Sequence, residues 1–145
     1  MSGAEPRVLL ELRFAARAKE LHGVREALRN AVSSEGRSDA WTQELVSAVD
    51  EACQNVIRYA YRETQTGDVE LRLERSDDRL VIWLRDFAPS SDPAYLSIPR
   101  DLAKVKPGGL GIHLMRELMD EIERVTLPEG DGNLLRMTKY FSRDS

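Results

Sequence analysis

The sequence predicts an α+β fold: a two-layer α/β sandwich with a mixed, mostly antiparallel sheet covered on one face by three helices. Segments with strand and helix periodicity follow one another in the order β-α-α-β-β-loop-α-β-β. Two of the strands are separated by a short polar turn, which predicts a hairpin. The helical segments carry apolar stripes, so we expect them to pack together on one face of the sheet.

Size and composition fit one compact domain over residues 1–145, long enough to bury a two-layer core. Apolar residues make up 41% and charged residues 32% of the chain, as in globular proteins. A net charge of −4 without a basic stripe argues against direct nucleic-acid binding. Apolar runs are too short to cross a membrane and no signal peptide is evident, so we expect a cytoplasmic protein.

Cysteine and histidine usage narrows the chemistry. Cys53 lies on the apolar side of its helix, where we expect a small buried side chain rather than a catalytic thiol. With one cysteine and with His22 and His113 as the two histidines, disulfides and histidine-rich metal sites are not expected.

The first half of the chain predicts a strand and two helices. Alternation over residues 8–14 predicts the opening strand. An apolar stripe over residues 18–31 predicts the first helix. Ser38 or Asp39 can cap the second helix, which is expected to end near Tyr61. Its core face is expected to hold Trp41, Leu45, Val49, Ala52, Cys53, Val56 and Ala60.

The second half predicts four strands and one helix. Residues 69–73 and 80–85 predict the hairpin, and a loop with four prolines follows over residues 87–107. Loops of this length in a small domain are functional or mobile. Residues 123–127 predict a strand, and the last strand is expected to run to Phe141. The third helix starts from a glycine cluster and is expected to bury Ile112, Met115, Leu118, Met119 and Ile122.

Glu51 and Asn55 lie one turn apart in the second helix. At about 100° per residue their side chains are about 40° apart, more than about 100° from the centre of the apolar stripe. A carboxylate can orient or deprotonate a hydroxyl, and a carboxamide oxygen suits Mg²⁺ held between protein and phosphates. On spacing alone, an ordinary solvated helix face is the favoured interpretation of the pair.

Asp86 ends an apolar strand, where it can accept a hydrogen bond from an exocyclic amine such as that of adenine. A plain strand-end turn residue is an equally good interpretation. Four basic residues can neutralise phosphates, although each alone is better explained as a surface charge: Arg25, Arg58, Lys104 and Lys106.

The glycine cluster at residues 108–111 leads directly into the third helix. Glycines allow close approach of the backbone to a ligand, and the first turn of a helix can direct free N–H groups at an anion. A plain turn is an equally good interpretation of the cluster taken alone. His113 follows the glycines and is expected to pack or cap near a bound nucleotide.

Three segments resemble, in this order, the N, G1 and G2 boxes of the Bergerat-fold ATPases: Glu51 to Tyr61, Arg85-Asp86, and Gly108 to Ile122. That superfamily includes gyrase and the histidine kinases. The short length, the Ala60-Tyr61 ending and residues 114–121 resemble the anti-sigma-factor serine kinases of bacterial partner-switching systems. The resemblance extends over residues 10–139, with residues 132–137 as the closing box, in which the family's usual threonine is missing.

The resemblance implies roles for individual residues. Glu51 matches the general base that takes a proton from a serine on a partner protein, Asn55 the Mg²⁺ ligand, and Asp86 the aspartate that reads adenine. Arg25 matches an arginine used in the partner contact, and residues 87–107 match the ATP lid. Further nucleotide contacts would come from Ala88, Lys106, Gly108, Gly109, Leu110, Gly111, Ile112, His113 and Asn133.

The resemblance also implies the cofactors and partners. ATP or ADP and Mg²⁺ would bind at the boxes. The partners would be a STAS-type anti-anti-sigma protein, phosphorylated on serine, and a sigma factor that the kinase sequesters. A homodimer is expected by the same analogy.

Ala88 departs from the family pattern, because the G1 box continues with glycines where this chain has Ala88-Pro89. A Cβ at that point can weaken nucleotide binding or lid closure. Two alternatives therefore stay open: a degenerate binding module without phosphoryl transfer, and an ATPase or detached histidine-kinase catalytic domain. The latter requires a phosphoacceptor histidine on a dimerisation helix, whereas His22 is expected to be a surface or packing residue.

Overall fold

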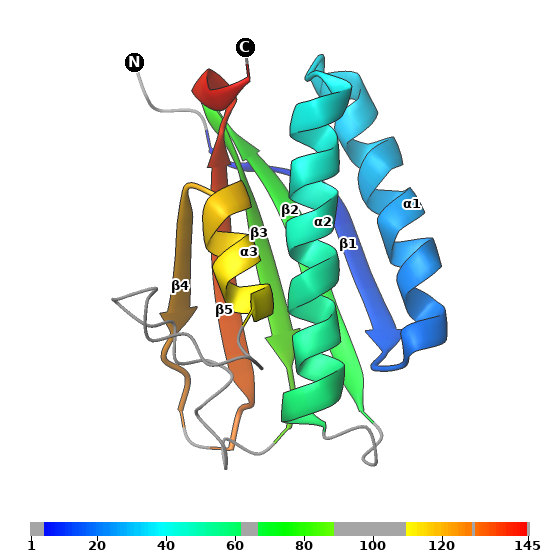
Figure 1. Ribbon diagram of the computed structural model, residues 1–145. Helices are drawn as coiled ribbons and strands as arrows, with labels where there is room; N and C mark the ends of the chain where they lie inside the picture. Colours follow the sequence, from blue (N-terminus) through cyan, green and yellow to red (C-terminus); the bar gives the residue numbers. More distant parts are fainter. Residues whose placement is uncertain (1–4, 62–66, 89–109, 129, 145) are drawn as a thin grey trace.

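The computed structural model describes residues 5–61, 67–88, 110–128 and 130–144, and for residues 110–113 it gives the backbone only. Its elements follow the order expected from the sequence (Figure 1). No helix among the described residues has the length and apolar character needed to span a bilayer. The main elements are β1 (Arg7–Ala15), α1 (Leu21–Val32), α2 (Asp39–Asn55), β2 (Asp68–Ser76), β3 (Arg79–Asp86), α3 (Leu110–Leu118), β4 (Glu121–Val125) and β5 (Asn133–Tyr140). Shorter turns are the 3₁₀ helices η1 (Ala18–Glu20), η2 (Ser33–Glu35) and η7 (Phe141–Arg143), and the π-helix η3 (Val56–Ala60).

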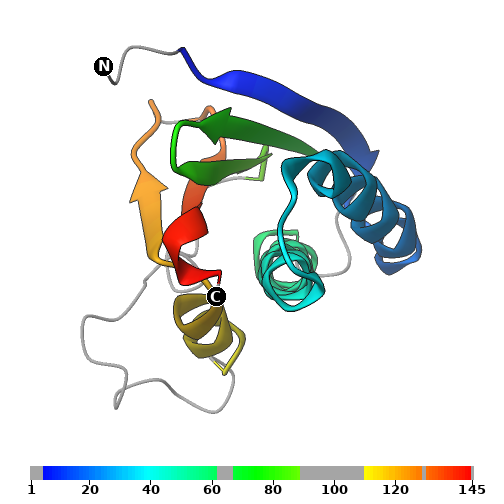
Figure 2. The same cartoon turned by 90° about the horizontal axis from the view of Figure 1, so that it is seen from above.

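The described strands form one five-stranded sheet in the order β1-β2-β3-β5-β4. All four pairings are antiparallel, so the described sheet is more uniform than the mixed sheet expected from the sequence. The three α-helices lie on one side of this curved sheet (Figure 2), which confirms the α+β sandwich. A shallow pocket on the sheet is lined by charged, aromatic and aliphatic side chains, among them Arg72, Trp83 and Leu134.

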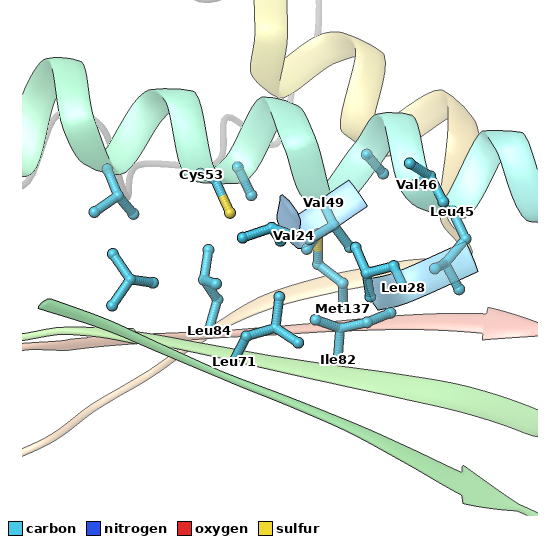
Figure 3. Packing of buried hydrophobic residues seen from close by; sticks show 14 of the residues in the cluster. Val24, Leu28, Leu45, Val46, Val49, Cys53, Leu71, Ile82, Leu84 and Met137 are labelled. Carbon is cyan, nitrogen blue, oxygen red and sulfur yellow. The ribbon is translucent and has the colours of Figure 1, made fainter. Parts of the chain in front are cut away.

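The core lies between the three α-helices and the covered face of the sheet. Ser38 begins α2 as an N-cap, since its Oγ accepts a hydrogen bond from the backbone N–H of Trp41 at 3.1 Å. Figure 3 shows Val49 and Cys53 of α2 among apolar side chains that include Leu71 of the sheet. All seven side chains expected on the core face of the second helix are buried.

The third helix is shorter than the sequence indicated. It ends at Leu118, and Ile122 lies in β4 opposite Met137, so the assignment of Ile122 to the helix was wrong. Ile122 fitted the apolar spacing of the helix because it packs against the core, but it does so from the strand. Asp120 marks the change, because its N–H donates to Thr138 O at 2.9 Å and its carboxylate accepts from the N–H of Tyr140 at 2.7 Å. The next strand accordingly spans Glu121–Val125 rather than residues 123–127.

Candidate functional site

Four of the predicted site segments lie toward one end of the molecule. The C-terminal part of α2, the end of β3, the start of β5 and the first turn of α3 all face the lower end in Figure 1. α3 packs beside α2, so the two helices that carry the predicted boxes are neighbours.

Glu51 and Asn55 are close in sequence and differ in exposure. The side chain of Glu51 is half-buried, whereas Asn55 is buried with 5% of its surface exposed. Within the part of the chain that the structure describes, neither side chain has a hydrogen bond or an ion pair. Because Asn55 is buried, it does not belong to a solvated helix face. Buried polar groups in proteins normally have a hydrogen-bond partner. The pair is therefore available to a ligand.

Asp86 is held in a corner at the end of β3. It is 2% exposed and lies opposite Asn133 in the sheet. Its Oδ1 accepts hydrogen bonds from Asn133 Nδ2 at 2.9 Å and from the N–H of Ala88 at 3.0 Å. The structure thus brings together three of the predicted nucleotide-binding residues, Asp86, Ala88 and Asn133. The N–H of Ala88 helps to hold the Asp86 carboxylate, and this hydrogen bond does not require a glycine at position 88.

Gly132 supports this corner, although the sequence assigned it no role of its own. Its φ is +88°, and a Cβ on it would lie 2.0 Å from the backbone oxygen of Asp86. Only glycine fits at such a contact. Its position in a Gly-Asp-Gly turn was the available signal, but the turn does not reveal which backbone lies against it.

Tyr61 is a second residue to which the sequence analysis assigned no role in the site. It is 3% exposed, its hydroxyl donates to Asp68 O at 2.8 Å, and it accepts from the N–H of Phe87 at 2.9 Å. Burial raises the pKa of Tyr61, and the negative charge of Asp86 acts in the same direction. No local pattern indicates these contacts, because they join segments distant in sequence.

Arg25, expected at a partner contact, has an intramolecular partner. Its Nη1 donates to Asp50 Oδ1 at 2.8 Å, and Gln54 Nε2 donates to Asp50 Oδ2 at 2.7 Å. A third of the Arg25 side chain stays exposed. Arg58 is exposed, with its guanidinium 5.7 Å from the centre of the Tyr59 ring.

Cys53 is buried, as predicted. Burial in the apolar core raises the pKa of its thiol to about 12, so it carries no thiolate at neutral pH. His22 is exposed on α1.

The glycine end of the site is only partly described. Leu110, Gly111, Ile112 and His113 form the first turn of α3. The remaining predictions of this region lie outside the described residues: the lid from residue 89 onward, Lys104, Lys106, Gly108 and Gly109.

Comparison with known proteins decides the family. The family model for the histidine kinase-like ATPase domain matches residues 14–139. The chain belongs to this family. It is 32% identical to serine-protein kinase RsbW of Bacillus licheniformis over 142 residues, which cover 93% of this chain and 87% of the relative. RsbW of Bacillus subtilis strain 168 is 30% identical, with 92% and 86% covered. The chain thus belongs with the RsbW serine-protein kinases, and the predicted resemblance is confirmed.

Solved structures confirm the fold. The SiaB–SiaC complex from Pseudomonas aeruginosa contains a chain that matches with a TM-score of 0.70 at 16% identity, covering 92% of this chain and 89% of that one. The RsbU and RsbW domains of a Mycobacterium tuberculosis protein match with a TM-score of 0.57 at 17% identity, covering 90% and 32%. At these identities, the two structures support the fold alone.

Proposed function

We propose that this protein is an ATP- and Mg²⁺-dependent serine kinase and anti-sigma factor. It phosphorylates a serine of a STAS-type anti-anti-sigma partner, and when free of that partner it sequesters a sigma factor. The observation that carries the proposal is Glu51, a carboxylate without a partner among the described residues, one turn from the buried and equally unpaired Asn55, in a chain of this kinase family.

Glu51 is the general base in this proposal. Its carboxylate is not engaged by any described cation, and it accepts the proton of the partner's serine hydroxyl as the oxygen attacks the γ-phosphorus. The bond from the γ-phosphorus to the β–γ bridging oxygen breaks, and ADP leaves with the electron pair of that bond. Phosphoryl transfer depends chiefly on positioning and charge neutralisation, so the helix contributes by fixing the direction of this carboxylate.

Asn55 fits the role of protein ligand to Mg²⁺. Its carboxamide oxygen is a hard donor, and Mg²⁺ in such sites takes few protein ligands beside phosphates and water. Bound there, the metal would neutralise charge on the phosphates. The backbone N–H groups of the first turn of α3, beginning at Leu110, would face the same phosphates.

Asp86 is the base-reading residue in this proposal. Its carboxylate accepts from the exocyclic amine of adenine, while Asn133 and the N–H of Ala88 keep it in place. Nucleotide binding is therefore expected in spite of Ala88.

Partner recognition is also part of the proposal. Relatives at about 30% identity are named serine-protein kinases, which act on another protein. Arg25 contacts a partner through its exposed third, held in place by Asp50. We place the protein in the cytoplasm, as a homodimer.

Transfer of label from γ-labelled ATP to a purified STAS-domain protein from the same cell tests the activity. Phosphoserine should form with the wild type and be lost with Glu51→Ala. Absence of transfer, with Glu51→Ala no worse than wild type, contradicts the kinase assignment.

The binding-module alternative, motivated by Ala88, predicts a different result. A degenerate pocket gives no heat in a calorimetric titration with ATP or ADP in the presence of Mg²⁺.

A further inference from the structure

Tyr61 follows a change in the course of the second helix. After Asn55 the chain continues as the π-helix η3, and the N–H of Tyr61 donates to Val56 O at 3.0 Å, a span of five residues. Such single π turns are rare and often mark functional sites. Here the wider turn is followed by a tyrosine whose ring enters the interior, 3% exposed.

Gly67 makes room for that ring. A Cβ on Gly67 would lie 2.4 Å from Cε1 of Tyr61, so a side chain at this position would collide with the ring. The Tyr61 hydroxyl then makes its two hydrogen bonds, to Asp68 O and from the N–H of Phe87. Asp68 opens β2 and Phe87 follows β3, so one hydroxyl joins two strands to the end of η3.

The contacts form a closed circuit. The carboxylate of Asp68 accepts from Arg13 Nε at 2.8 Å, and the Arg13 guanidinium lies 5.0 Å from the centre of the Phe87 ring. The guanidinium of Arg85 also contacts the Phe87 ring, 4.8 Å from its centre. Phe87 is thus held by its backbone through Tyr61 and by its ring through two arginines, and it is the residue next to Asp86.

We propose that Tyr61 is a positioning residue that fixes the base-reading corner at Asp86 relative to Asn55, the metal-binding end of the site. The Asp86 carboxylate can select adenine only if its direction is fixed. Two hydrogen bonds fix the backbone that follows Asp86: the N–H of Phe87 donates to the Tyr61 hydroxyl, and the N–H of Ala88 donates to Asp86 itself. This inference rests on the proposed ATP-dependent function.

Tyr61→Phe tests the proposal, because it keeps the ring against Gly67 and removes both hydroxyl bonds. Calorimetric titrations with Mg²⁺-ATP and Mg²⁺-GTP give two dissociation constants. We expect the constant for ATP to rise about tenfold, as for loss of a buried hydrogen bond. The constant for GTP should change little, because guanine has a carbonyl oxygen where adenine has the amine that Asp86 reads. The preference for ATP therefore falls by a similar factor.

Tyr140→Phe is the matched control. Tyr140 also donates its hydroxyl to a neighbour, Glu121, but it lies at the end of β5 opposite Arg79. The same chemical change there should leave the nucleotide preference unaltered. A merely structural role of Tyr61 lowers the melting temperature without changing the preference for ATP over GTP, measured where both variants are folded, and that result overturns the proposal.

Hydrogen exchange of the nucleotide-free protein separates this inference from the proposed function. In Tyr61→Phe the Phe87 amide should exchange at least about tenfold faster, while amides of β5 such as Met137 keep their rates. Arg13→Ala opens the circuit from the exposed side without disturbing the core, and a smaller acceleration at Phe87 is expected. Unchanged exchange at Phe87 in Tyr61→Phe contradicts the positioning role. A wild type that binds no ATP contradicts the proposed function instead, and leaves the exchange result to decide the role of Tyr61.

Discussion

Asp50 and Glu51 are consecutive acidic residues of α2 with different surroundings. Asp50 has both carboxylate oxygens engaged, by Arg25 of α1 and by Gln54. Glu51 has no hydrogen bond or ion pair within the described residues, and neither has Asn55 one turn later. The side of α2 that includes Asp50 holds the two helices together, whereas the side that includes Glu51 and Asn55 has polar groups left for another molecule.

The comparison extends to Asp86, which is fully buried in a corner made by the chain. Its Oδ1 has two donors, from Ala88 and Asn133, and Gly132 lies against its backbone. A base-reading carboxylate must be fixed in direction before the ligand arrives, while a metal ligand and a general base must keep their oxygens for the reactants. The two ends of the candidate site therefore differ in the way their proposed roles require.

The largest expected effect comes from Glu51→Gln. Loss of the general base should lower serine phosphorylation by about 10³-fold, because general base catalysis contributes about 10² to 10⁴. The dissociation constant for ATP should change less than about threefold, since the amide keeps the shape of the side chain. Steady-state transfer of labelled phosphate and calorimetry measure the two effects.

Asp50→Asn is the neighbouring control for that measurement. At saturating partner protein it should keep transfer within about threefold, and it should lower the melting temperature instead, because Asp50 acts through Arg25 and Gln54. Equal loss of transfer in the two variants would remove the distinction between the two sides of α2.

Gly132→Ala disturbs the corner at Asp86 without touching Glu51 or Asn55. The positive φ, and a Cβ placed only 2.0 Å from the Asp86 carbonyl oxygen, should lower the free energy of unfolding by about 3 kcal/mol or more. Gly130 has a φ of +89° and open space around its Cβ position, so Gly130→Ala should cost about 1 kcal/mol. Denaturant unfolding of the two variants isolates the close contact, and equal losses would show that the corner tolerates a side chain.

Cys53 lies on a third side of α2, which faces the core. Its burial predicts that the free energy of unfolding depends on pH in the alkaline range. Burial raises the pKa of this thiol from 9.0 to about 12, so its contribution to stability is complete below pH 9 and lost as the pH rises toward 12. At pH 11 the wild type should have lost roughly 3 kcal/mol by this route, since each pH unit between the two pKa values costs about 1.4 kcal/mol. Cys53→Ala should be less stable than wild type at pH 7 by about 1 kcal/mol and more stable at pH 11. A pH-independent difference between them contradicts the burial effect.

The smallest effect is expected from the ion pair between Arg25 and Asp50. The two side chains are 33% and 19% exposed, and solvent screens such pairs. A double-mutant cycle with Arg25→Ala and Asp50→Ala should give a coupling of about 0.5 to 1 kcal/mol in the free energy of unfolding. A coupling near zero would mean that Arg25 is held no more firmly than any surface arginine, which weakens its proposed role at a partner contact.

The order of the elements was predictable because periodicity is a local property of the chain. The boundary between α3 and β4 was not, since Ile122 packs against the core equally well from a helix or a strand. The spacing of Glu51 and Asn55 was visible, but the burial of Asn55 depends on neighbours that the helix alone does not specify.

The contacts of Tyr61 and Gly132 lay beyond sequence reasoning for the same physical reason. Each joins segments far apart in the chain, Tyr61 with Phe87 and Gly132 with Asp86. Sequence patterns identified the residues that resemble a family's boxes, and tertiary structure was needed to find the residues that hold them.

A crystal structure with Mg²⁺ and a non-hydrolysable ATP analogue tests the central claim most directly. The account predicts that Asn55 Oδ1 coordinates the metal, that the Glu51 carboxylate faces the γ-phosphate, and that Asp86 accepts a hydrogen bond from the adenine amine. A nucleotide bound elsewhere, or bound with Glu51 and Asn55 directed away from its phosphates, would contradict it.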